Sequence, residues 1–333
     1  MNLGKLGQAL TGREIFDLIQ DELEQVEKRI TVESVSSVDA VTLIGQYLQS
    51  AGGKRLRPAL LLLSAKLAGN CGSSAIQLAA VVELIHAATL VHDDVIDAAE
   101  TRRGRPSTNV KWGNHTCVLA GDWLYMQAFQ MALRERSFHI LDLLIGLTQM
   151  MVEGELLQLE RIGRLEVSEA DCMQLVDRKT ACLFSVCAQI GAIAGGADIR
   201  AQEKLRDYAW NLGMAFQLVD DVLDFTAREK VLGKPVGGDL REGKVTLPLV
   251  YALERATPNE RGLVATILHT RNYQEVPFDR ILALLEKYQG IERVKERAQA
   301  FTNSARQTIS EFPDSSYQRA LLAVTELVTE RDH

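Results

Sequence analysis

The stretch "SSAIQLAAVVELIHAATLVHDDVID" (residues 73–97) joins a long apolar pattern to three closely spaced carboxylates. Small and apolar residues such as Ala80, Leu84 and Ala88 recur at helical spacing, and Ser73 or Ser74 can cap the start. A helix with so apolar a face has to be covered by neighbouring helices. The stretch therefore predicts a core helix of an all-α fold.

Helical periodicity continues through most of the remaining chain, without an alternating strand pattern of useful length. No Pro/Ser-rich linker divides the sequence, so we expect one all-α domain over residues 1–333, a single large helical bundle. The further predicted helices cover residues 13–29, 38–50, 57–69, 114–134, 138–160, 168–195, 201–226, 245–255, 260–270, 277–288, 291–311 and 316–331.

Composition excludes several classes of protein. The chain has 333 residues, of which 47% are hydrophobic and 24% charged, so it can form a large core. Its net charge of −7 argues against a nucleic-acid partner. Five cysteines form no CxxC pair, and the N-terminus lacks the apolar core of a signal peptide. With no run of 18 uncharged apolar residues, these features predict a cytoplasmic protein without a membrane span.

A second acidic cluster, "LVDDVLD" (218–224), nearly repeats the end of the opening stretch. Carboxylates four residues apart share one helix face, where they repel each other and the negative helix C-terminus. A hard divalent cation removes this conflict, and Mg²⁺ suits it because it binds one or two carboxylates together with water and phosphate. A solvated acidic helix end is the alternative, and the repetition weakens it. The candidate metal ligands are Asp93, Asp94, Asp97, Asp220, Asp221 and Asp224.

Basic residues accompany both acidic clusters. The segments "GGKRLRP" (52–58) and "RRGR" (102–105) carry arginines that can grip phosphate with two hydrogen bonds. Each cation alone suits a solvated surface, but together with paired metal sites they indicate two polyanion sites. The basic candidates are Lys54, Arg55, Arg57, Arg102, Arg103, Lys179, Lys234 and Lys244, and His86 lies two helical turns before Asp93.

Two segments, 98–113 and 227–243, are expected to be irregular, and each directly follows an acidic cluster. Loops of this length in a compact domain are usually functional. The pair "HDD" (92–94) also occurs in metal phosphohydrolases, but that chemistry needs more histidine ligands than 6 histidines and Val219 provide. No GxxxxGK[ST], GxSxG or HExxH motif points to another reaction.

The order and spacing of these motifs resemble the trans-isoprenyl diphosphate synthases, also called polyprenyl synthetases. The resemblance runs from about Gly52 to Leu249 through "GGKRLRP", "LIHAATLVHDDVID", "RRGRPSTN", "GDWL", "DRKTACLF", "FQLVDDVLD" and "GKPVGGDLREGKVTLPL". It implies an all-α bundle around a central cavity, usually a homodimer. It also implies Mg²⁺-dependent condensation of an allylic prenyl diphosphate with isopentenyl diphosphate.

The same resemblance implies a role for each matching residue. The six aspartates would bind two to three Mg²⁺ ions, with Arg102, Lys179 and Lys234 assisting catalysis. The allylic diphosphate would contact Arg102, Lys179, Thr180, Gln217, Lys234 and Lys244. Isopentenyl diphosphate would contact Lys54, Arg57, His86 and Arg103.

Product length is expected to depend on the helix that carries the first cluster. Thr89 and Ala88 precede Asp93 by four and five residues, which places them about 6–7.5 Å below the metals. The resemblance implies that bulky residues there stop elongation early, whereas both side chains here are small. We therefore expect a product longer than C20, with Ile85 as a deeper candidate stop, and expect Ala88→Phe to shorten it.

Three alternatives stay open from the sequence. A geranylgeranyl or farnesyl diphosphate synthase would make a shorter product with the same motifs. A class I terpene cyclase also uses DDxxD, but it needs no "GGKRLRP" pocket for isopentenyl diphosphate. A non-catalytic subunit of a heteromeric synthase is disfavoured by two intact acidic clusters.

Peripheral contact with a membrane is compatible with an apolar product.

Overall fold

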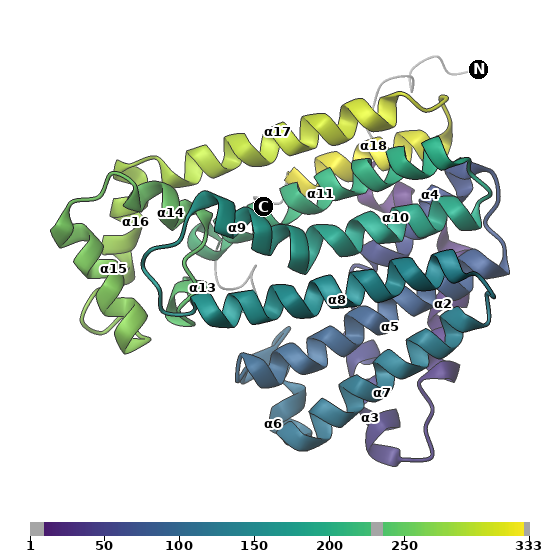
Figure 1. The fold of residues 1–333 in the computed structure, drawn as a ribbon, viewed down its shortest axis with the longest axis horizontal. Coiled ribbons are helices and arrows are strands. Elements are labelled where there is room, and N and C mark those ends of the chain that lie inside the picture. Colours follow the sequence, from purple (N-terminus) through teal and green to yellow (C-terminus); the bar gives the residue numbers. More distant parts are fainter. Residues whose placement is uncertain (1–9, 228–235, 330–333) are drawn as a thin grey trace.

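The computed structural model describes residues 10–227 and 236–329, and this part of the chain is almost entirely helical (Figure 1). One π-helical turn, η1 (Asp177–Ala181), and two short paired strands, β1 (Thr101–Arg102) and β2 (Arg105–Pro106), complete it. The helices are α1 (Gly12–Asp17), α2 (Gln20–Glu33), α3 (Asp39–Ser50), α4 (Leu56–Ala68), α5 (Ser73–Ile96), α6 (Thr108–Trp112), α7 (Asn114–Leu133), α8 (Phe138–Arg161), α9 (Glu169–Val176), α10 (Cys182–Ala194), α11 (Ile199–Thr226), α13 (Gly238–Arg241), α14 (Leu247–Leu253), α15 (Pro258–Thr270), α16 (Phe278–Lys287), α17 (Gly290–Ser310) and α18 (Ser316–Thr329).

The long helices pack side by side around the apolar residues of α4, α5 and α10. Helix α10 lies between α4 and α11, α7 packs along α5, and α17 covers α11 (Figure 1). Val81 and Ile85 of α5 have no exposed surface, and neither does Ile190 of α10. The all-α fold class and the core position of the helix over 73–97 are confirmed.

The structure corrects three details of the predicted elements. The helix expected over 13–29 is two helices, because the chain turns at Leu18 and Ile19 between α1 and α2. Two segments expected to be irregular contain regular elements: 98–113 holds the β1–β2 hairpin and helix α6, and the described part of 227–243 holds helix α13. The helix expected over 168–195 runs without a break from α9 to α10, but it contains the π-helical turn η1.

Helix α5 is the one described helix that is long and apolar enough to cross a membrane. In the fold 61% of its most apolar window is buried against other helices. Burial of this kind is typical of a core helix, and length and composition alone are weak evidence for a membrane span.

Gly191 allows α10 to pack closely against α4. A Cβ built at Gly191 would lie 2.2 Å from the carbonyl oxygen of Leu61, a backbone atom that cannot rotate away. We expect Gly191→Ala to lower the free energy of unfolding by about 1–3 kcal/mol, as overpacking usually does. Gly146→Ala on α8 is the matched control, because nothing lies within 4 Å of its Cβ position. Thermal unfolding of both variants checks this, and equal melting temperatures would contradict it.

Candidate active site

The two acidic clusters lie at the C-terminal ends of the two helices that carry them. Asp93 and Asp94 are in the last turn of α5, and Asp97 caps it. Asp220, Asp221 and Asp224 are in the last two turns of α11. Both helices thus direct their negative ends and their carboxylates to the same part of the molecule.

Asp94 is fully buried and bonded through both carboxylate oxygens. Its Oδ1 accepts from Arg102 Nε at 2.6 Å, and its Oδ2 accepts from the amide and the hydroxyl of Thr108 at 2.9 and 2.8 Å. These bonds tie the β1–β2 hairpin and the start of α6 to the end of α5. The sequence makes Asp94 a candidate metal ligand, but in this structure both its oxygens accept hydrogen bonds, and it positions Arg102.

Asp93 and Asp221 are carboxylates whose ionisation is unfavourable without a further cation. Burial raises the pKa of Asp93 to about 6, with smaller contributions from Glu155 and Asp97. Burial, and then the nearby Asp239, raises the pKa of Asp221 well above its usual range. A bound cation would relieve both, because it stabilises the charged form.

The second cluster is fixed by hydrogen bonds from three segments. Thr180 of η1 donates to Gln217 Oε1 at 2.7 Å, and Gln217 donates to Asp221 Oδ1 at 2.9 Å. The backbone amide of Asp239 donates to Asp224 Oδ2 at 3.2 Å. The polar chain from η1 to α11 aligns Thr180, Gln217 and Asp221 along one wall.

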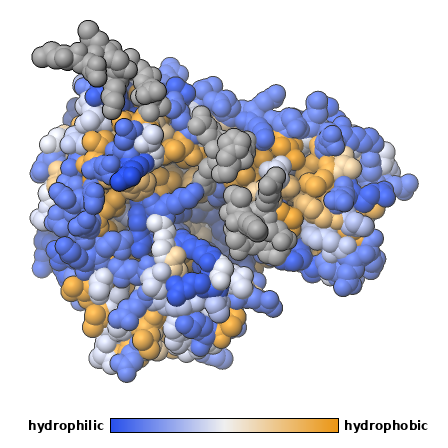
Figure 2. All heavy atoms as spheres, turned by 180° about the vertical axis from the view of Figure 1, so that it is seen from behind, coloured by the Kyte–Doolittle hydropathy of each residue, from blue (hydrophilic) through white to orange (hydrophobic). Residues whose placement is uncertain are grey.

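A cavity of about 300 Å³ lies between the two clusters. Figure 2 shows hydrophilic residues around a hollow near the middle of the back face of the molecule. Apolar residues, including Met151, Leu175 and Leu183, also line the cavity. The predicted site residues among its lining are Asp93, Asp221, Arg57, His86, Thr89, Lys179, Thr180, Gln217 and Lys244.

Two lysines of the cavity pair with carboxylates in this structure. Lys179, presented by η1, lies 2.5 Å from Glu155 and donates to Gln158 at 3.0 Å. Lys244 donates to Asp97 at 3.1 Å, so it joins the segment after α13 to the end of α5. Despite burial, the carboxylates of Asp97 and Glu242 hold the pKa of Lys244 above its ordinary value.

On another wall, Arg57 donates to His86 Nε2 at 3.1 Å. A guanidinium has only donors, so this nitrogen accepts and the imidazole is neutral. Burial lowers the pKa of His86 far below its ordinary value, and Arg57 and Arg103 lower it further. Arg103 lies beside this pair, and Lys54 is exposed on the turn before α4.

Some predicted residues fall outside the cavity lining. The residues that do not line it are Asp94, Asp97, Asp220, Asp224, Arg102, Arg103 and Lys54, and Lys234 lies outside the described residues. Ala88 and Ile85 are fully buried in the core, whereas Thr89 lines this cavity and a second one. The second cavity, about 340 Å³, lies between α5, α7 and α8 and also contains Asp93, Met151 and Lys179.

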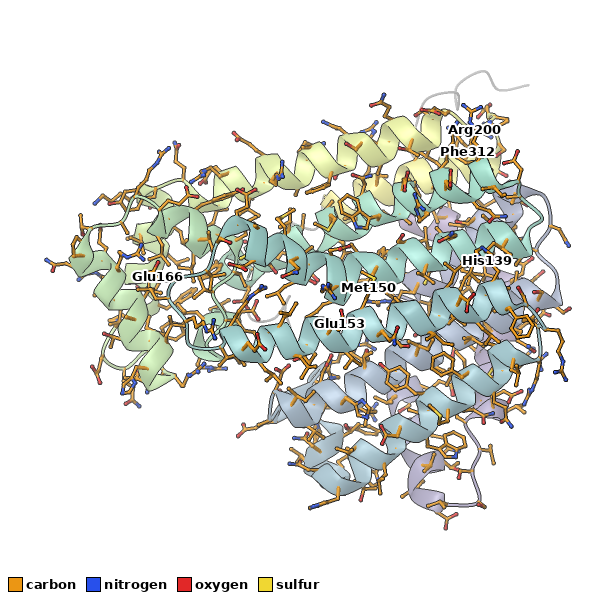
Figure 3. The ribbon with its side chains drawn as sticks, viewed as in Figure 1. His139, Met150, Glu153, Glu166, Arg200 and Phe312 are labelled. Carbon is orange, nitrogen blue, oxygen red and sulfur yellow. The ribbon has the colours of Figure 1, made fainter. Side chains whose placement is uncertain are left out.

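Sequence reasoning missed the contribution of α8. Glu155 and Gln158 both hold Lys179, and their spacing of three on a helix was the available signal. Gly154 lets η1 approach α8, because a Cβ there would lie 2.8 Å from Arg178 Cβ. On the outer side, Glu153 of α8, labelled in Figure 3, pairs with Arg178.

The donor set suits a hard divalent cation that is completed by a ligand. Among the described residues no group of three His, Cys, Asp or Glu side chains could hold a metal ion by itself. The carboxylates of Asp93 and Asp221 nevertheless line one cavity with raised pKa values. Water and phosphate oxygens commonly supply the other ligands of Mg²⁺, so a diphosphate fits between the clusters.

A helical bundle that gathers aspartates, lysines and arginines around one cavity defines an enzyme of the diphosphate-processing class. The family model for polyprenyl synthetase matches residues 38–285, and the chain belongs to this family.

The chain is similar to octaprenyl diphosphate synthases. It is 37% identical to that of Haemophilus influenzae over 96% of this chain and 97% of the relative. It is 35% identical to that of Escherichia coli over the full length of both. Among solved structures, a polyprenyl synthase from Caulobacter crescentus, complexed with calcium and isoprenyl diphosphate, has a TM-score of 0.92 and 34% identity, covering 98% of this chain and 100% of that one.

Proposed function

We propose that this enzyme elongates an allylic prenyl diphosphate by head-to-tail condensation with isopentenyl diphosphate. The observation that carries the proposal is one cavity lined by an aspartate from each acidic cluster, by Lys179 and Lys244, and by the Arg57–His86 pair. Relatives over the full chain are trans-prenyltransferases that carry the names octaprenyl and nonaprenyl diphosphate synthase. The reaction is an ionisation, a condensation and an elimination.

The residues divide into two diphosphate sites. Asp93 and Asp97 on α5, with Asp220, Asp221 and Asp224 on α11, would hold two to three Mg²⁺ ions, while Asp94 orients Arg102. Mg²⁺, when bound, supplies Lewis-acid stabilisation of the departing diphosphate. Around the allylic diphosphate we place Arg102, Lys179, Thr180, Gln217, Lys234 and Lys244. Around isopentenyl diphosphate we place Lys54, Arg57, His86 and Arg103.

The apolar lining protects the reaction. Met151, Leu175 and Leu183 exclude water from the allylic cation, which attack by the double bond of isopentenyl diphosphate then consumes. The Nε2 lone pair of His86 accepts a hydrogen bond from Arg57, so we assign His86 to substrate binding and not to removal of the proton. The released diphosphate is the base that completes each cycle.

The product is longer than C20. We assign the path of the growing chain to Thr89, because its small side chain lines both cavities and the second has apolar lining residues that include Val152 and Leu156. A decaprenyl diphosphate synthase from Rhodobacter capsulatus, with a TM-score of 0.92, 34% identity and coverage of 97% of this chain, supports a long product. A geranylgeranyl or farnesyl diphosphate synthase is not favoured, and neither is a terpene cyclase.

The proposal is tested by incubating the purified protein with radiolabelled isopentenyl diphosphate, Mg²⁺ and C10, C15 or C20 primers. Incorporation into products beyond C20 is expected after dephosphorylation and chromatography. Absence of incorporation with every primer would overturn the proposed function. Products from a single primer would instead identify the preferred substrate.

The activity should depend on pH through Asp93. Its pKa of about 6 means that below this pH a proton competes with the metal for the carboxylate. We expect the Mg²⁺ concentration for half-maximal rate to rise as pH falls from 7 to 5. Initial rates over a matrix of pH and Mg²⁺ concentration measure this. A requirement for Mg²⁺ that stays constant over this range would contradict it.

We propose that the enzyme is a homodimer that pairs through α7 and α8. Exposed large apolar residues gather on these two helices, and a second copy of the same face can cover them. The second cavity opens between the same helices, which makes this face continuous with the candidate site. The exposed residues are Val118, Leu119, Met126 and Leu133 on α7 and Phe138, Ile145, Val152, Leu156 and Leu159 on α8.

Charge placed on this face should separate the copies. We expect the double variant Leu119→Glu/Leu156→Glu to sediment as a monomer, whereas the wild-type protein sediments as a dimer. Val32→Glu on α2 is the control, since Val32 is equally apolar and 69% exposed on another element. Analytical ultracentrifugation distinguishes the species. A monomeric wild type, or dimerisation of the double variant, would refute the pairing.

We further propose one domain over residues 1–333 and a cytoplasmic enzyme without a nucleic-acid partner, which contacts membranes only peripherally to release its product. The net charge of −7 and the buried position of α5 support this. Co-sedimentation with lipid vesicles in the presence of product tests the contact. Protein found only in the supernatant would contradict it.

A further inference from the structure

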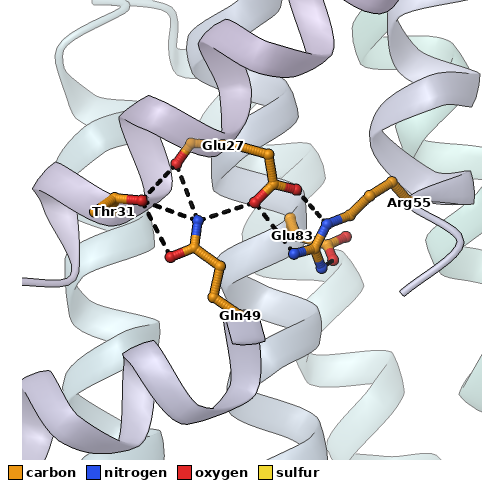
Figure 4. Close-up of polar contacts among 5 residues, drawn as sticks. All are labelled: Glu27, Thr31, Gln49, Arg55 and Glu83. Carbon is orange, nitrogen blue, oxygen red and sulfur yellow. Dashed lines mark hydrogen bonds and ion pairs between the residues drawn. The ribbon is translucent and has the colours of Figure 1, made fainter. Parts of the chain in front are cut away.

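Arg55 differs from the other cations of the "GGKRLRP" segment. It has φ +48°, in the left-handed region that residues with a Cβ rarely adopt, and it precedes the first residue of α4. Its guanidinium does not line the cavity between the acidic clusters. It bonds instead to Glu27 on α2 and, at 2.7 Å, to Glu83 on α5 (Figure 4).

The carboxylate of Glu27 is itself held in place. Gln49 of α3 donates to Glu27 Oε2 at 2.9 Å and to the carbonyl of Glu27 at 3.1 Å. Thr31 donates to Gln49 Oε1 at 3.1 Å and completes the group (Figure 4). Three helices thus fix the side chain of Arg55 from both sides, and this fixes the backbone at the start of α4.

Glu83 connects this group to the candidate isopentenyl diphosphate site. It lies one turn before His86 on α5, and Arg57 lies two residues after Arg55. The Arg55–Glu83 ion pair therefore spans the same two helices as the Arg57–His86 hydrogen bond. Loss of the ion pair would let the start of α4 move relative to α5 and separate Arg57 from His86.

Glu83 is also the carboxylate that offsets a cluster of cations. Burial lowers the pKa of Arg57, and Glu83 is the largest influence opposing it. Burial, then Arg102 and Arg55, lower the pKa of Arg103, and Glu83 again opposes this. With a side chain only 12% exposed, Glu83 acts at close range on the cations that would receive a diphosphate.

We propose that Glu83, acting through Arg55, is a positioning residue that sets the affinity for isopentenyl diphosphate. The proposal rests on the function proposed above. It assigns to Glu83 no contact with substrate. Its effect is to keep Arg57 within hydrogen-bonding distance of His86, although its negative charge alone would repel a diphosphate.

These two effects have opposite signs, which makes the proposal testable. If Glu83 acted only through its charge, removing it would strengthen binding of isopentenyl diphosphate and lower KM. If it positions Arg57 through Arg55, removing it raises KM. We expect Glu83→Ala to raise KM for isopentenyl diphosphate at least fivefold, with KM for the allylic primer changed less than twofold.

A double-mutant cycle separates positioning from a general loss of stability. Arg55→Gln should raise KM for isopentenyl diphosphate as Glu83→Ala does, and the double variant should be no worse than either. If Glu83→Ala does not fold, Arg55→Lys replaces it in the test. Lysine keeps the positive charge but cannot bond to Glu27 and Glu83 as the guanidinium does, so KM for isopentenyl diphosphate should again rise. Glu311→Ala is the control, because it removes an ion pair with Lys204 between α11 and α17.

Initial rates with each substrate varied in turn supply all these values, and thermal unfolding confirms that each variant is folded. An unchanged or lower KM for isopentenyl diphosphate in Glu83→Ala and Arg55→Lys, or fully additive effects, would overturn the proposal. Absence of incorporation by the wild-type enzyme would instead remove the proposed function, so the two failures are distinguishable.

Discussion

Asp93→Asn should lower kcat by about 10³-fold, a loss comparable to removing one preorganised electrostatic group from an active site. Asn keeps the volume of Asp but cannot supply the negative charge that a divalent cation needs. Asp93 lines the cavity between the acidic clusters, where the positive charge of Lys179 acts on its carboxylate. Initial rates at saturating Mg²⁺ and both substrates measure the effect.

The same variant should be at least as stable as the wild type at pH 8. The pKa of Asp93 is raised by burial to about 6, above its value in the unfolded chain. Its contribution to stability is thus full below the unfolded pKa and is lost as pH rises through 6. At pH 8 the ionised carboxylate is a cost that Asn removes. Thermal unfolding of metal-free protein checks this.

Asp207→Asn is the matched control, since Asp207 is exposed and pairs only with its neighbour Arg206 on α11. It should keep both rate and melting temperature. A rate loss below tenfold in Asp93→Asn would show that Asp93 is not a metal ligand. A large drop in its melting temperature would show that the residue stabilises the fold instead.

Thr89→Phe should shorten the main product from beyond C20 to C20 or less. Thr89 lines both the cavity between the acidic clusters and the one between α5, α7 and α8, so a phenyl group there blocks the passage. Its hydroxyl donates only to the carbonyl of His86, at 2.7 Å. Chromatography of dephosphorylated products gives the length.

Thr89→Val keeps the shape and should leave the product length unchanged. Ala88→Phe, the substitution suggested by the sequence, is a less direct test, because Ala88 is fully buried in the core and a larger side chain there overpacks it. A product of full length from Thr89→Phe would place the elongation path elsewhere.

The sequence predicted the parts of this fold that depend on local pattern. Apolar spacing located the long helices, including α5 and α11, to within a few residues. The i, i+4 spacing of Asp93 and Asp97 placed both at the end of α5. These features depend on periodicity within one helix, which a single sequence carries.

What it could not predict depends on contacts between distant segments. The partners of Asp94 are Arg102 and Thr108, and both belong to a segment expected to be irregular. The π-helical turn that presents Lys179 requires close approach to Gly154 of α8. Whether Ala88 or Thr89 lines the cavity depends on how α5 is rotated about its own axis. Packing against the other helices determines that rotation.

The ion pair between Lys244 and Asp97 has a kinetic consequence. In this structure each of these groups has a partner of opposite charge, and Lys179 likewise pairs with Glu155. In the proposed reaction, binding of substrate or metal has to break these internal ion pairs, because each new contact uses a group that is already paired. The internal pairs then compete with diphosphate after each condensation. We expect their re-formation to favour departure of the diphosphate leaving group.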